Sequence, residues 1–357
     1  MTESHSALLP VVLVGAGTRA RSFYAPLLRG LLADRFELVG LVARSEGRVR
    51  RLAEELELPW ALSLEEAKKW GARGAVVAVS PDQNHAVADQ LVDLGLPALL
   101  ETPLALDLED AGPLLQRLEQ SGLPFELAEQ NPRHLGPMLW TKLVRAGHLG
   151  QLRAAISDGQ GYRYHATAVA RSLFGRSTGL RASALRVSSG IDLGRGTSSE
   201  PLYMGSITVR GGGLFQMRAS EVFYCEESGW VPGPWTLLGD RGSINAEVGL
   251  RVSGPSEQRL RPFEWQRGTN GNLIGLAASG VHEGSVEVTL PGEALDDDEQ
   301  AVARCLLDWL ARLEGVVTDT AWSPRDGYID LQWIASLERS ALLAGAPLNI
   351  EELKNQS

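Results

Sequence analysis

The sequence predicts an α/β fold in which a doubly wound parallel sheet is followed by an α+β domain with a largely antiparallel open sheet. Three observations carry this prediction. An apolar strand leads into a glycine turn and a helix near the N-terminus, strands alternate with helices as far as residue 128, and strands separated by Gly-, Pro- and Asp-rich turns dominate thereafter. At 357 residues the chain exceeds the size of a single core. We therefore expect two domains, residues 1–129 and 130–357.

The first predicted strand, Val11 to Val14, runs directly into Gly15-Ala16-Gly17. Residues 18–32 follow at helical spacing, with alanine at position 20, where a third glycine is usual. A glycine turn that leads into a helix presents unpaired N–H groups and the positive end of the helix dipole to an anion. The pattern indicates a dinucleotide site, and a purely structural turn is the alternative. The residues assigned to it are Gly15, Gly17, Thr18, Arg19 and Ala20.

The rest of the first domain alternates strands with helices. Strands are predicted at 36–43, 58–62, 74–79, 96–100 and 124–128, and helices at 64–70, 86–94 and 106–120. Parallel strands in a doubly wound sheet end at one edge, where ligands bind. The residues expected to line one cleft at that edge are Gly15, Arg44, Ser80, Glu101 and Glu129.

The end of the second strand indicates which dinucleotide would bind. Arg44, Ser45 and Arg48 stand there, where an acidic residue would accept hydrogen bonds from the ribose hydroxyls of NAD. Arginine and serine suit a 2′-phosphate instead, so the sequence favours NADP, with NAD still possible. The alternative is that Arg44 begins a solvated basic helix that includes Arg50 and Arg51.

Beyond residue 130 the pattern is that of an α+β domain. Helices are predicted at 138–146, 166–174, 296–313 and 323–343, and strands at 152–157, 185–187, 203–209, 214–224, 235–238, 243–248 and 285–290. The helix at 296–313 opens with Asp296, Asp297, Asp298 and Glu299, which suits the helix dipole. Because no histidine accompanies these carboxylates, we expect a solvated helix start and no metal site.

Composition excludes several classes of function. The net charge of −10 argues against nucleic acid or an anionic membrane as the main partner. Cys225 and Cys305 are the only cysteines, too few for a disulfide framework or a thiolate metal site. No signal peptide or membrane span is expected, since no apolar run approaches the roughly 20 residues that a span requires. These features favour a cytoplasmic protein.

Several motifs in order resemble the glucose–fructose oxidoreductase/inositol dehydrogenase (Gfo/Idh/MocA) family over nearly the whole chain. After the glycine turn, Ser80-Pro81 with His85 resembles a segment that lines the nicotinamide side of the cofactor in that family. Leu100 to Ala105 resembles its Glu-Lys-Pro-Leu-Ala signature, which places Glu101 at the cofactor. Asn131, Arg133 and Pro137 resemble an Asn-Arg-Arg-Phe-x-Pro segment, with proline one place late. Later landmarks are Leu149-Gly150, residues 239–243 and residues 324–327.

The resemblance implies a reactive centre from which this chain departs. Sugar-oxidising members place a lysine in Glu-Lys-Pro and an Asp-x-x-x-His pair in the second domain. Here the lysine position is Thr102, which can hydrogen-bond but carries no charge. His165 matches the family histidine, whereas Gly161 and Ala168 stand where aspartates are common. One of three polar groups therefore remains, and Thr102 joins His165 as a candidate catalytic residue.

Aromatic and basic residues surround that histidine, in Tyr162-Arg163-Tyr164-His165. By the resemblance, Tyr162, Arg163 and His165 face the nicotinamide and bind or protonate a substrate, with His165, Tyr162 or Tyr164 as the proton donor and Arg163 as a substrate-binding residue; alternatively, they cap a helix and fill a domain boundary. Asn131 and Arg133 are also assigned to the substrate, although Arg133 could pair with Glu129 instead. His85 is assigned to the cofactor, with a helix cap as the alternative.

The sequence thus predicts an NADP-dependent oxidoreductase. Without the lysine and aspartate, alcohol oxidation lacks its base, so we expect reduction of a C=N or C=O group in a small biosynthetic intermediate, free or bound to a carrier or peptide. Imine reductases of the family also lack the lysine. The alternatives are a catalytically silent member that binds a partner in the old cleft, and a lyase or hydrolase with a tightly held nicotinamide. Residues 214–219 alternate apolar positions, which fits a homodimer or homotetramer or simple core packing.

Overall fold

The computed structural model describes residues 8–160, 162–188, 201–219, 235–253, 258–281, 285–287 and 295–351. The chain divides into two compact units. Unit 1 comprises residues 1–133 and 290–328, and unit 2 comprises residues 134–289 and 329–357. The segment 290–328, which we expected in the second domain, therefore belongs to unit 1. The reason is that helix α8 (Asp297–Leu313) buries Val302, Leu306 and Trp309 in the core of unit 1.

The described part of unit 1 contains a six-stranded parallel sheet in the order β3-β2-β1-β4-β5-β6. This order reverses at β1, as in a doubly wound sheet. Strands β4 and β5 and residues 11–14 of β1 are buried, which is typical of parallel strands covered on both faces. The strands are β1 (Leu9–Val14), β2 (Phe36–Val42), β3 (Trp60–Ala61), β4 (Gly74–Val77), β5 (Ala98–Leu100) and β6 (Glu126–Leu127).

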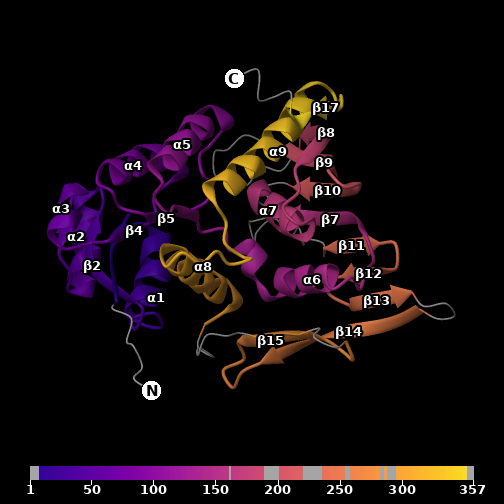
Figure 1. The fold of residues 1–357 in the computed structure, drawn as a ribbon, viewed down its shortest axis with the longest axis horizontal. Coiled ribbons are helices and arrows are strands. Elements are labelled where there is room, and N and C mark those ends of the chain that lie inside the picture. Colours follow the sequence, from indigo (N-terminus) through magenta and orange to yellow (C-terminus); the bar gives the residue numbers. More distant parts are fainter. Residues whose placement is uncertain are drawn as a thin grey trace. The chain divides into compact units, whose positions relative to one another are not determined.

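Helices cover both faces of this sheet. Figure 1 shows α4 (Pro81–Asp93) and α5 (Leu108–Ser121) on the side opposite to α1 (Ala25–Arg29) and α8. The helix after the glycine turn begins with a π-helical segment, Ala20–Tyr24, and ends at Arg29 rather than residue 32. Helix α4 begins at Pro81, earlier than expected, because proline is favoured in the first helical turn. The remaining helices are α2 (Glu46–Leu56), α3 (Glu65–Lys69) and the 3₁₀ turn Asn131–Arg133.

The acidic start of α8 has the expected role. The side chain of Asp296 accepts a hydrogen bond from the backbone N–H of Glu299 at 2.8 Å, and the Glu299 carboxylate accepts one from the N–H of Asp296 at 2.9 Å. This capping box satisfies two backbone donors at the helix start. The acidic residues thus stabilise the end of a helix that supports unit 1.

Unit 2 is built on a mostly antiparallel sheet, as expected. Its described strands follow the order β16-β15-β14-β13-β12-β11-β7-β10-β9-β8-β17, and only β7 and β10 pair in parallel. Helices α6 (Leu135–Arg145), α7 (Arg163–Leu173) and α9 (from Pro324 to Leu342) contribute to it. The strands are β7 (Leu152–Gln160), β8 (Gly179–Ser188), β9 (Pro201–Val209), β10 (Gly213–Ala219), β11 (Thr236–Gly239), β12 (Gly242–Asn245), β13 (Gly249–Ser253), β14 (Gln258–Arg267), β15 (Leu273–Ala278), β16 (Ser285–Glu287) and β17 (Leu348–Asn349).

The sequence analysis missed β13, β14, β15 and β17, and β8 extends well beyond the predicted residues 185–187. Strand β14 carries six charged or amide side chains among its ten residues, so it does not show the apolar run on which the prediction depended. The predicted strand residues 220–224 and 288–290, together with Gly161 and Cys225, lie outside the described residues.

Strand β10 shows which face of the unit 2 sheet is covered. Phe215, Met217 and Ala219 point into the core, whereas Leu214 on the other face is 36% exposed. Further apolar side chains are exposed on the neighbouring strands β8 and β9. The alternation in residues 214–219 therefore reflects core packing on one face, and the other face remains accessible in this chain.

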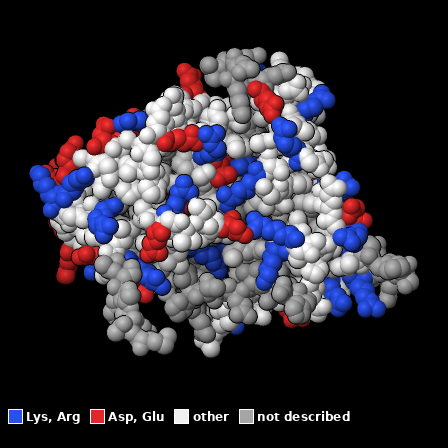
Figure 2. Space-filling view, in the orientation of Figure 1, with Lys and Arg blue, Asp and Glu red and all other residues white. Residues whose placement is uncertain are grey.

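Figure 2 shows acidic and basic side chains interspersed over the face that it presents. None of the helices in the described part of the chain combines the length and apolar character that a membrane-spanning helix requires.

Candidate functional site

The glycine turn after β1 has a geometry that only glycine tolerates at its first position. Gly15 adopts φ +117°, and a Cβ placed there would collide with the carbonyl oxygen of Ala78. Its N–H donates to the carbonyl of Val42 at 2.8 Å, which ties the turn to β2. At Gly17 a Cβ would meet no atom within 4 Å. The turn is therefore closely packed behind Gly15 and open in front of Gly17, as a phosphate cradle requires.

The start of the following helix completes this cradle. Ala20, in place of a third glycine, is fully buried in the core of unit 1, so its methyl group is accommodated. The N–H of Arg21 bonds to the carbonyl of Gly17 at 3.0 Å, which shows that helical bonding begins at the turn. N–H groups before that point, including that of Thr18, are at the positive end of the helix.

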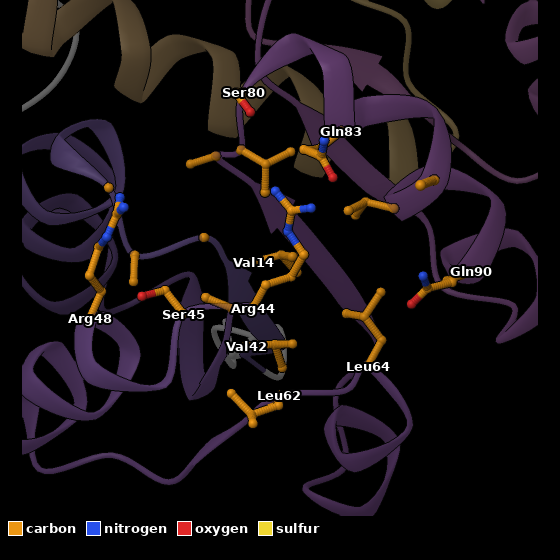
Figure 3. A pocket seen from close by; sticks show the side chains of 18 residues that line it. Val14, Val42, Arg44, Ser45, Arg48, Leu62, Leu64, Ser80, Gln83 and Gln90 are labelled. Carbon is orange, nitrogen blue, oxygen red and sulfur yellow. The ribbon is translucent and has the colours of Figure 1, made fainter.

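A cavity of about 440 Å³ lies at the carboxyl ends of β1, β2 and β4. Apolar side chains form much of its wall and polar ones its rim, as in Figure 3. The sequence analysis expected the strand-end residues among its lining, but not those contributed by α4 and by the segment after β3. The lining consists of Val14, Gly15, Ala16, Gly17, Val42, Ala43, Arg44, Ser45, Arg48, Leu62, Leu64, Ala78, Val79, Ser80, Gln83, Ala86, Val87 and Gln90.

The two arginines of this cavity occupy different parts of it. In Figure 3 the guanidinium of Arg44 points toward Gln83, whereas Arg48 lies next to Ser45. Arg44 also has an acidic neighbour, the exposed Asp82. Hydrogen bonds from Ser80 and Gln83 lower the pKa of Asp82, and the charge of Arg44 lowers it to a smaller extent. Arg44 is therefore partly compensated by the protein.

A second cavity, of about 530 Å³, lies against α2 and shares Ala16, Gly17 and Arg48 with the first. Arg51 and the hydroxyl residues Thr18 and Ser22 also line it. Among the described residues, no carboxylate pairs with Arg48 or Arg51. Positive charge that the protein does not neutralise is thus concentrated beside the glycine turn.

Glu101, expected to contact a cofactor, is occupied by protein donors. Its Oε1 accepts from Arg19 Nε at 2.6 Å and from the Tyr24 hydroxyl at 2.8 Å. Its Oε2 accepts from the backbone N–H of Thr102 at 3.1 Å. The carboxylate thus anchors Arg19 and the chain that follows β5.

Asn84 is a site residue that the sequence analysis missed. It is fully buried in α4, and its Nδ2 donates to the carbonyls of Pro103 at 2.8 Å and Glu101 at 3.1 Å. These bonds hold the segment that carries Thr102. Its neighbour His85 lies outside the cavity lining, with Nε2 at 3.6 Å from Asp89 on the same helix.

The prediction that Arg133 binds substrate is wrong. Its guanidinium is fully buried and donates to Asp308 Oδ2 at 2.8 Å, to Glu126 Oε1 at 3.0 Å and to the carbonyl of Glu129 at 2.7 Å. The alternative expectation was a pair with the Glu129 carboxylate, whereas the carboxylates that contact Arg133 are those of Glu126 and Asp308. Asn131 begins the same 3₁₀ turn, and its N–H bonds to Glu129 Oε1 at 3.1 Å.

This buried cluster perturbs two ionisable groups. Burial, opposed in part by Arg133, raises the pKa of Glu126 to about 7. Burial also raises the pKa of Cys305, which is fully enclosed in unit 1 and remains a thiol. Neither group is open to a ligand, so the cluster has a structural role.

In unit 2 the aromatic cluster forms at the start of α7. His165 is 5% exposed, and its ring lies 4.3 Å from that of Tyr164 and 6.2 Å from that of Tyr162, centroid to centroid. Arg163 is held within the same unit by Glu338, at 2.7 Å, and by the ring of Tyr203. Tyr162 is the most exposed of the four, so the cluster is open on that side.

The described residues contain no group of three or more His, Cys, Asp or Glu side chains with the arrangement of a metal site. The chemistry available in unit 1 is instead that of anion and ring recognition. A glycine turn, a helix start, an apolar cavity and unneutralised arginines at the edge of a doubly wound sheet define a dinucleotide-binding domain of the Rossmann type.

The family follows from comparison with known proteins. Residues 9–128 match the model of the GFO_IDH_MocA family, described as "Oxidoreductase family, NAD-binding Rossmann fold". The resemblance inferred from the motifs is thereby confirmed over residues 9–128. No curated protein matches the chain in sequence.

Solved structures share the fold over nearly the whole chain. An oxidoreductase from Agrobacterium radiobacter in complex with NAD⁺, L-tartaric acid and magnesium is 14% identical, with a TM-score of 0.74 over 97% of this chain and 100% of its own. An inositol dehydrogenase homologue from Azotobacter vinelandii complexed with NAD⁺ is 15% identical, with a TM-score of 0.73 over 98% of this chain and 99% of its own. A putative myo-inositol dehydrogenase from Sinorhizobium meliloti is 15% identical, with a TM-score of 0.70 over 96% of this chain and 99% of its own.

Proposed function

We propose that the protein is an NADP(H)-dependent oxidoreductase that reduces a C=N or C=O group of a small molecule. The observation that carries the proposal is the cavity beside the glycine turn, in which Arg44, Ser45 and Arg48 follow β2 and no acidic side chain is among the lining. An acidic residue at this strand end would favour the ribose hydroxyls of NAD, whereas arginine and serine favour a 2′-phosphate. The solved structures of similar fold that contain NAD⁺ support a dinucleotide in general.

The residues of unit 1 fit such a coenzyme. Gly15 and Gly17 would hold the diphosphate, because the turn is open in front of Gly17. The apolar side chains of Leu62 and Leu64 suit one side of an adenine ring. When bound, the coenzyme supplies a hydride to the acceptor carbon, and the protein must supply the proton.

His165 is our candidate for that proton, with Tyr162 or Tyr164 as the other donors. A histidine that is 5% exposed and lies against the rings of Tyr162 and Tyr164 has little contact with bulk water, which suits a proton donor to a substrate. Thr102 adds a hydroxyl donor without charge. Reduction is favoured over oxidation because Thr102 supplies no cation to lower the pKa of a base.

Coenzyme titration tests the proposal. NADPH and NADH are titrated into the wild type and into Arg48→Met, following nicotinamide fluorescence. We expect the wild type to bind NADPH about tenfold or more tightly than NADH, and Arg48→Met to lose that difference, since a charge-assisted phosphate contact is worth about 1.5–3 kcal/mol. Arg50→Met is the matched control, because Arg50 on the same helix is exposed and pairs with Glu54.

Each other outcome is informative. Equal affinities for the two coenzymes in the wild type would refute the preference for NADP, and no binding of either would favour the catalytically silent protein instead. For the reductase step, His165→Ala is tested in single turnover with bound NADPH and a panel of cyclic imines and ketones. Full activity of that variant would exclude His165 as the donor.

We further propose that the chain forms a homodimer or homotetramer through the open face of the unit 2 sheet. Leu185, Val187 and Met204 are 58%, 53% and 50% exposed on β8 and β9, and Leu185 is the register partner of Met204. Neighbouring exposed apolar residues are typical of protein interfaces. Light scattering should give a multiple of the chain mass for the wild type and a smaller mass for Met204→Glu; a monomeric wild type would refute the proposal.

A further inference from the structure

Two arginines of unit 2 lie against the ring of the same tyrosine, Tyr203 on β9. Arg163, the first residue of α7, places its Cζ 4.4 Å from the ring centroid, and Arg186 on β8 places its Cζ 5.9 Å from it. A guanidinium near an aromatic ring is attracted by the negative face of that ring. The ring of Tyr203 therefore helps to orient both cations.

The sheet places Arg186 on the face that is covered by the helices of unit 2. Arg186 is the register partner of Tyr203, which is in turn the register partner of Ala219 on β10, a residue buried in the core. Side chains along β8 alternate between the two faces, so that Ala184 is buried and Leu185 is exposed. Arg186 therefore continues the core-side face at the end of the strand.

The protein compensates the charge of only one of these arginines. Nη1 of Arg163 lies 2.7 Å from a carboxylate oxygen of Glu338 on α9. Arg186 is exposed, and no carboxylate pairs with it within the described ranges of the chain. Two cations beside one ring repel each other, and Glu338 offsets that repulsion at Arg163 alone. The arrangement thus offers one uncompensated positive charge.

This charge belongs to the cluster that carries the candidate proton donor. Arg163 and Tyr164 begin α7, and the ring of Tyr164 lies 4.3 Å from that of His165, centroid to centroid. Because Arg163 contacts Tyr203 and Tyr203 contacts Arg186, consecutive contacts connect the uncompensated cation to the first turn of this helix. A substrate at His165 therefore meets a face of unit 2 that carries an unneutralised guanidinium.

We propose that the substrate carries a carboxylate, which Arg186 binds, and that Tyr203 and Arg163 position Arg186 for this contact. The inference rests on the proposed function and names its substrate class, an imino acid or an oxo acid. A guanidinium presents a planar fork of N–H donors that matches the two oxygens of a carboxylate. A monoanion also matches the single uncompensated charge, whereas a phosphate dianion exceeds it and is repelled by Glu338.

Matched anionic and neutral probes test this assignment. Picolinate and pyruvate, each paired with its neutral amide, are titrated by calorimetry into the wild type. NADP⁺ is present throughout, because it cannot reduce the probes. Each carboxylate should bind at least about tenfold more tightly than its amide, since a charge-assisted pair replaces a neutral hydrogen bond. A wild type without this preference, or without measurable affinity for either carboxylate, would overturn the inference.

Two variants of β8 locate the contact. In Arg186→Met the affinities for carboxylate and amide should differ by less than about twofold, because the charge is absent. Arg181→Met is the matched control: Arg181 is exposed on the same strand, and its neighbour Ala182 is buried, so Arg181 points to the opposite face. The control should keep the wild-type preference. A preference that survives in Arg186→Met, or that is lost equally in Arg181→Met, would refute the assignment.

Variants of Tyr203 test the positioning role. Tyr203→Phe keeps the ring and should keep the preference for carboxylates, whereas Tyr203→Leu should lower it about two- to fivefold, because the cation–π contact is lost. Equal preferences in these two variants would exclude that role. If Arg186→Met does not fold, Arg186→Lys retains a charge without the planar fork and should keep only part of the preference; the full preference in that variant would count against the fork.

Two further results separate this inference from the function on which it rests. Inorganic phosphate that binds more tightly than the carboxylates, and only while Arg186 is present, would overturn the assignment of a carboxylate. If the wild type binds neither NADP⁺ nor NADPH, the proposed function itself fails. If it binds the coenzyme and shows no preference for carboxylates, only the inference about Arg186 fails.

Discussion

Replacing Arg133 with methionine tests whether this arginine stabilises unit 1 or serves a ligand. Its guanidinium makes hydrogen bonds to Asp308, Glu126 and the carbonyl of Glu129, with no exposed surface. Methionine fills part of the volume but donates nothing. The substitution therefore leaves two carboxylates facing each other in a buried space, which is the more expensive part of the change.

The magnitude follows from that geometry. Removing one partner of a buried ion pair costs about 3–5 kcal/mol, because the remaining charge is left unpaired. Asp308 retains bonds from the hydroxyls of Thr318, at 2.5 Å, and Thr320, at 2.7 Å, and Glu126 retains the N–H of Trp322 at 3.2 Å. Because these hydrogen bonds still stabilise the two carboxylates, we expect a loss of stability in the lower half of that range. At about 2–4 °C per kcal/mol for a unit of this size, the midpoint of thermal unfolding should fall by roughly 6–15 °C.

Calorimetric melting of wild type and variants provides the assay. Arg325→Met is the control, since Arg325 forms an exposed pair with Glu119 and its loss should cost less than about 1 kcal/mol. Adding Glu126→Gln to Arg133→Met removes one unpaired charge and should recover part of the midpoint. An Arg133→Met protein that melts with the wild type but has lost turnover of its substrate would refute this reasoning and restore the substrate-binding role.

Three more outcomes are expected. Gly15→Ala should abolish coenzyme binding measured by nicotinamide fluorescence, because φ +117° and the Ala78 carbonyl both exclude a Cβ; retained affinity would contradict the turn geometry. The pKa of Glu126 is about 7 in the folded protein, against an ordinary value of 4.5. Between these values the folded state keeps a proton that the unfolded state releases. The free energy of unfolding should therefore fall by up to about 3 kcal/mol as pH rises from 4.5 to 7, and then level off. Melting curves of Glu126→Gln across that range should lack this slope, and an equal slope in wild type and variant would exclude Glu126 as its source. Asn84→Leu should cost about 1–3 kcal/mol by denaturant titration, since it leaves the carbonyls of Glu101 and Pro103 unpaired, and an unchanged midpoint would show that water replaces the amide.

The strands of unit 1 could be predicted from the sequence because they are buried on both faces. Residues 74–77 and 98–100 are entirely enclosed, so each appears as an uninterrupted run of small and apolar residues. Strand β14 could not be found in the same way, because its apolar residues Leu260, Phe263 and Trp265 are isolated among charged and amide residues and show no regular alternation. Of these three only Phe263 is buried, so the strand has no apolar face for the pattern to reveal.

The position of α8 shows a different limit. Its apolar stripe and acidic start are evident in the sequence, and the helix forms where expected. Which sheet it covers depends on the shape of the surface that it meets. Trp309 stacks on Phe36 with the rings 6.3 Å apart, and its indole N–H bonds to the carbonyl of Pro124 at 3.2 Å. Partners so far apart in the sequence leave no local signal, and the domain boundary depended on them.

For the site, the rule that ligands meet strand ends identified Gly15, Arg44 and Ser80 correctly as lining residues. Gln83 lies before the helix predicted at 86–94, because the start of α4 was placed too late. Val87 and Gln90 lay inside that predicted helix, but the rule of strand ends does not extend to residues of a following helix. A helix beginning at Pro81 brings positions 83, 87 and 90 to the same side, and turns His85 away from it.

The arginines of unit 1 differ in how the protein compensates their charge, and that difference separates structural from ligand-binding roles. Arg133 is buried between two carboxylates, so it has no charge to offer. Arg19 is also paired with two carboxylates, those of Glu101 and Asp298, but its side chain is partly exposed. Arg48 and Arg51 meet no carboxylate within the part of the chain that is described. Since burying an unpaired cation is costly, the uncompensated arginines stay at the surface, where an anion can reach them. Because the charges of Arg48 and Arg51 attract the coenzyme, its affinity should decrease as ionic strength rises. The decrease should be smaller in Arg48→Met, which lacks one of the two charges.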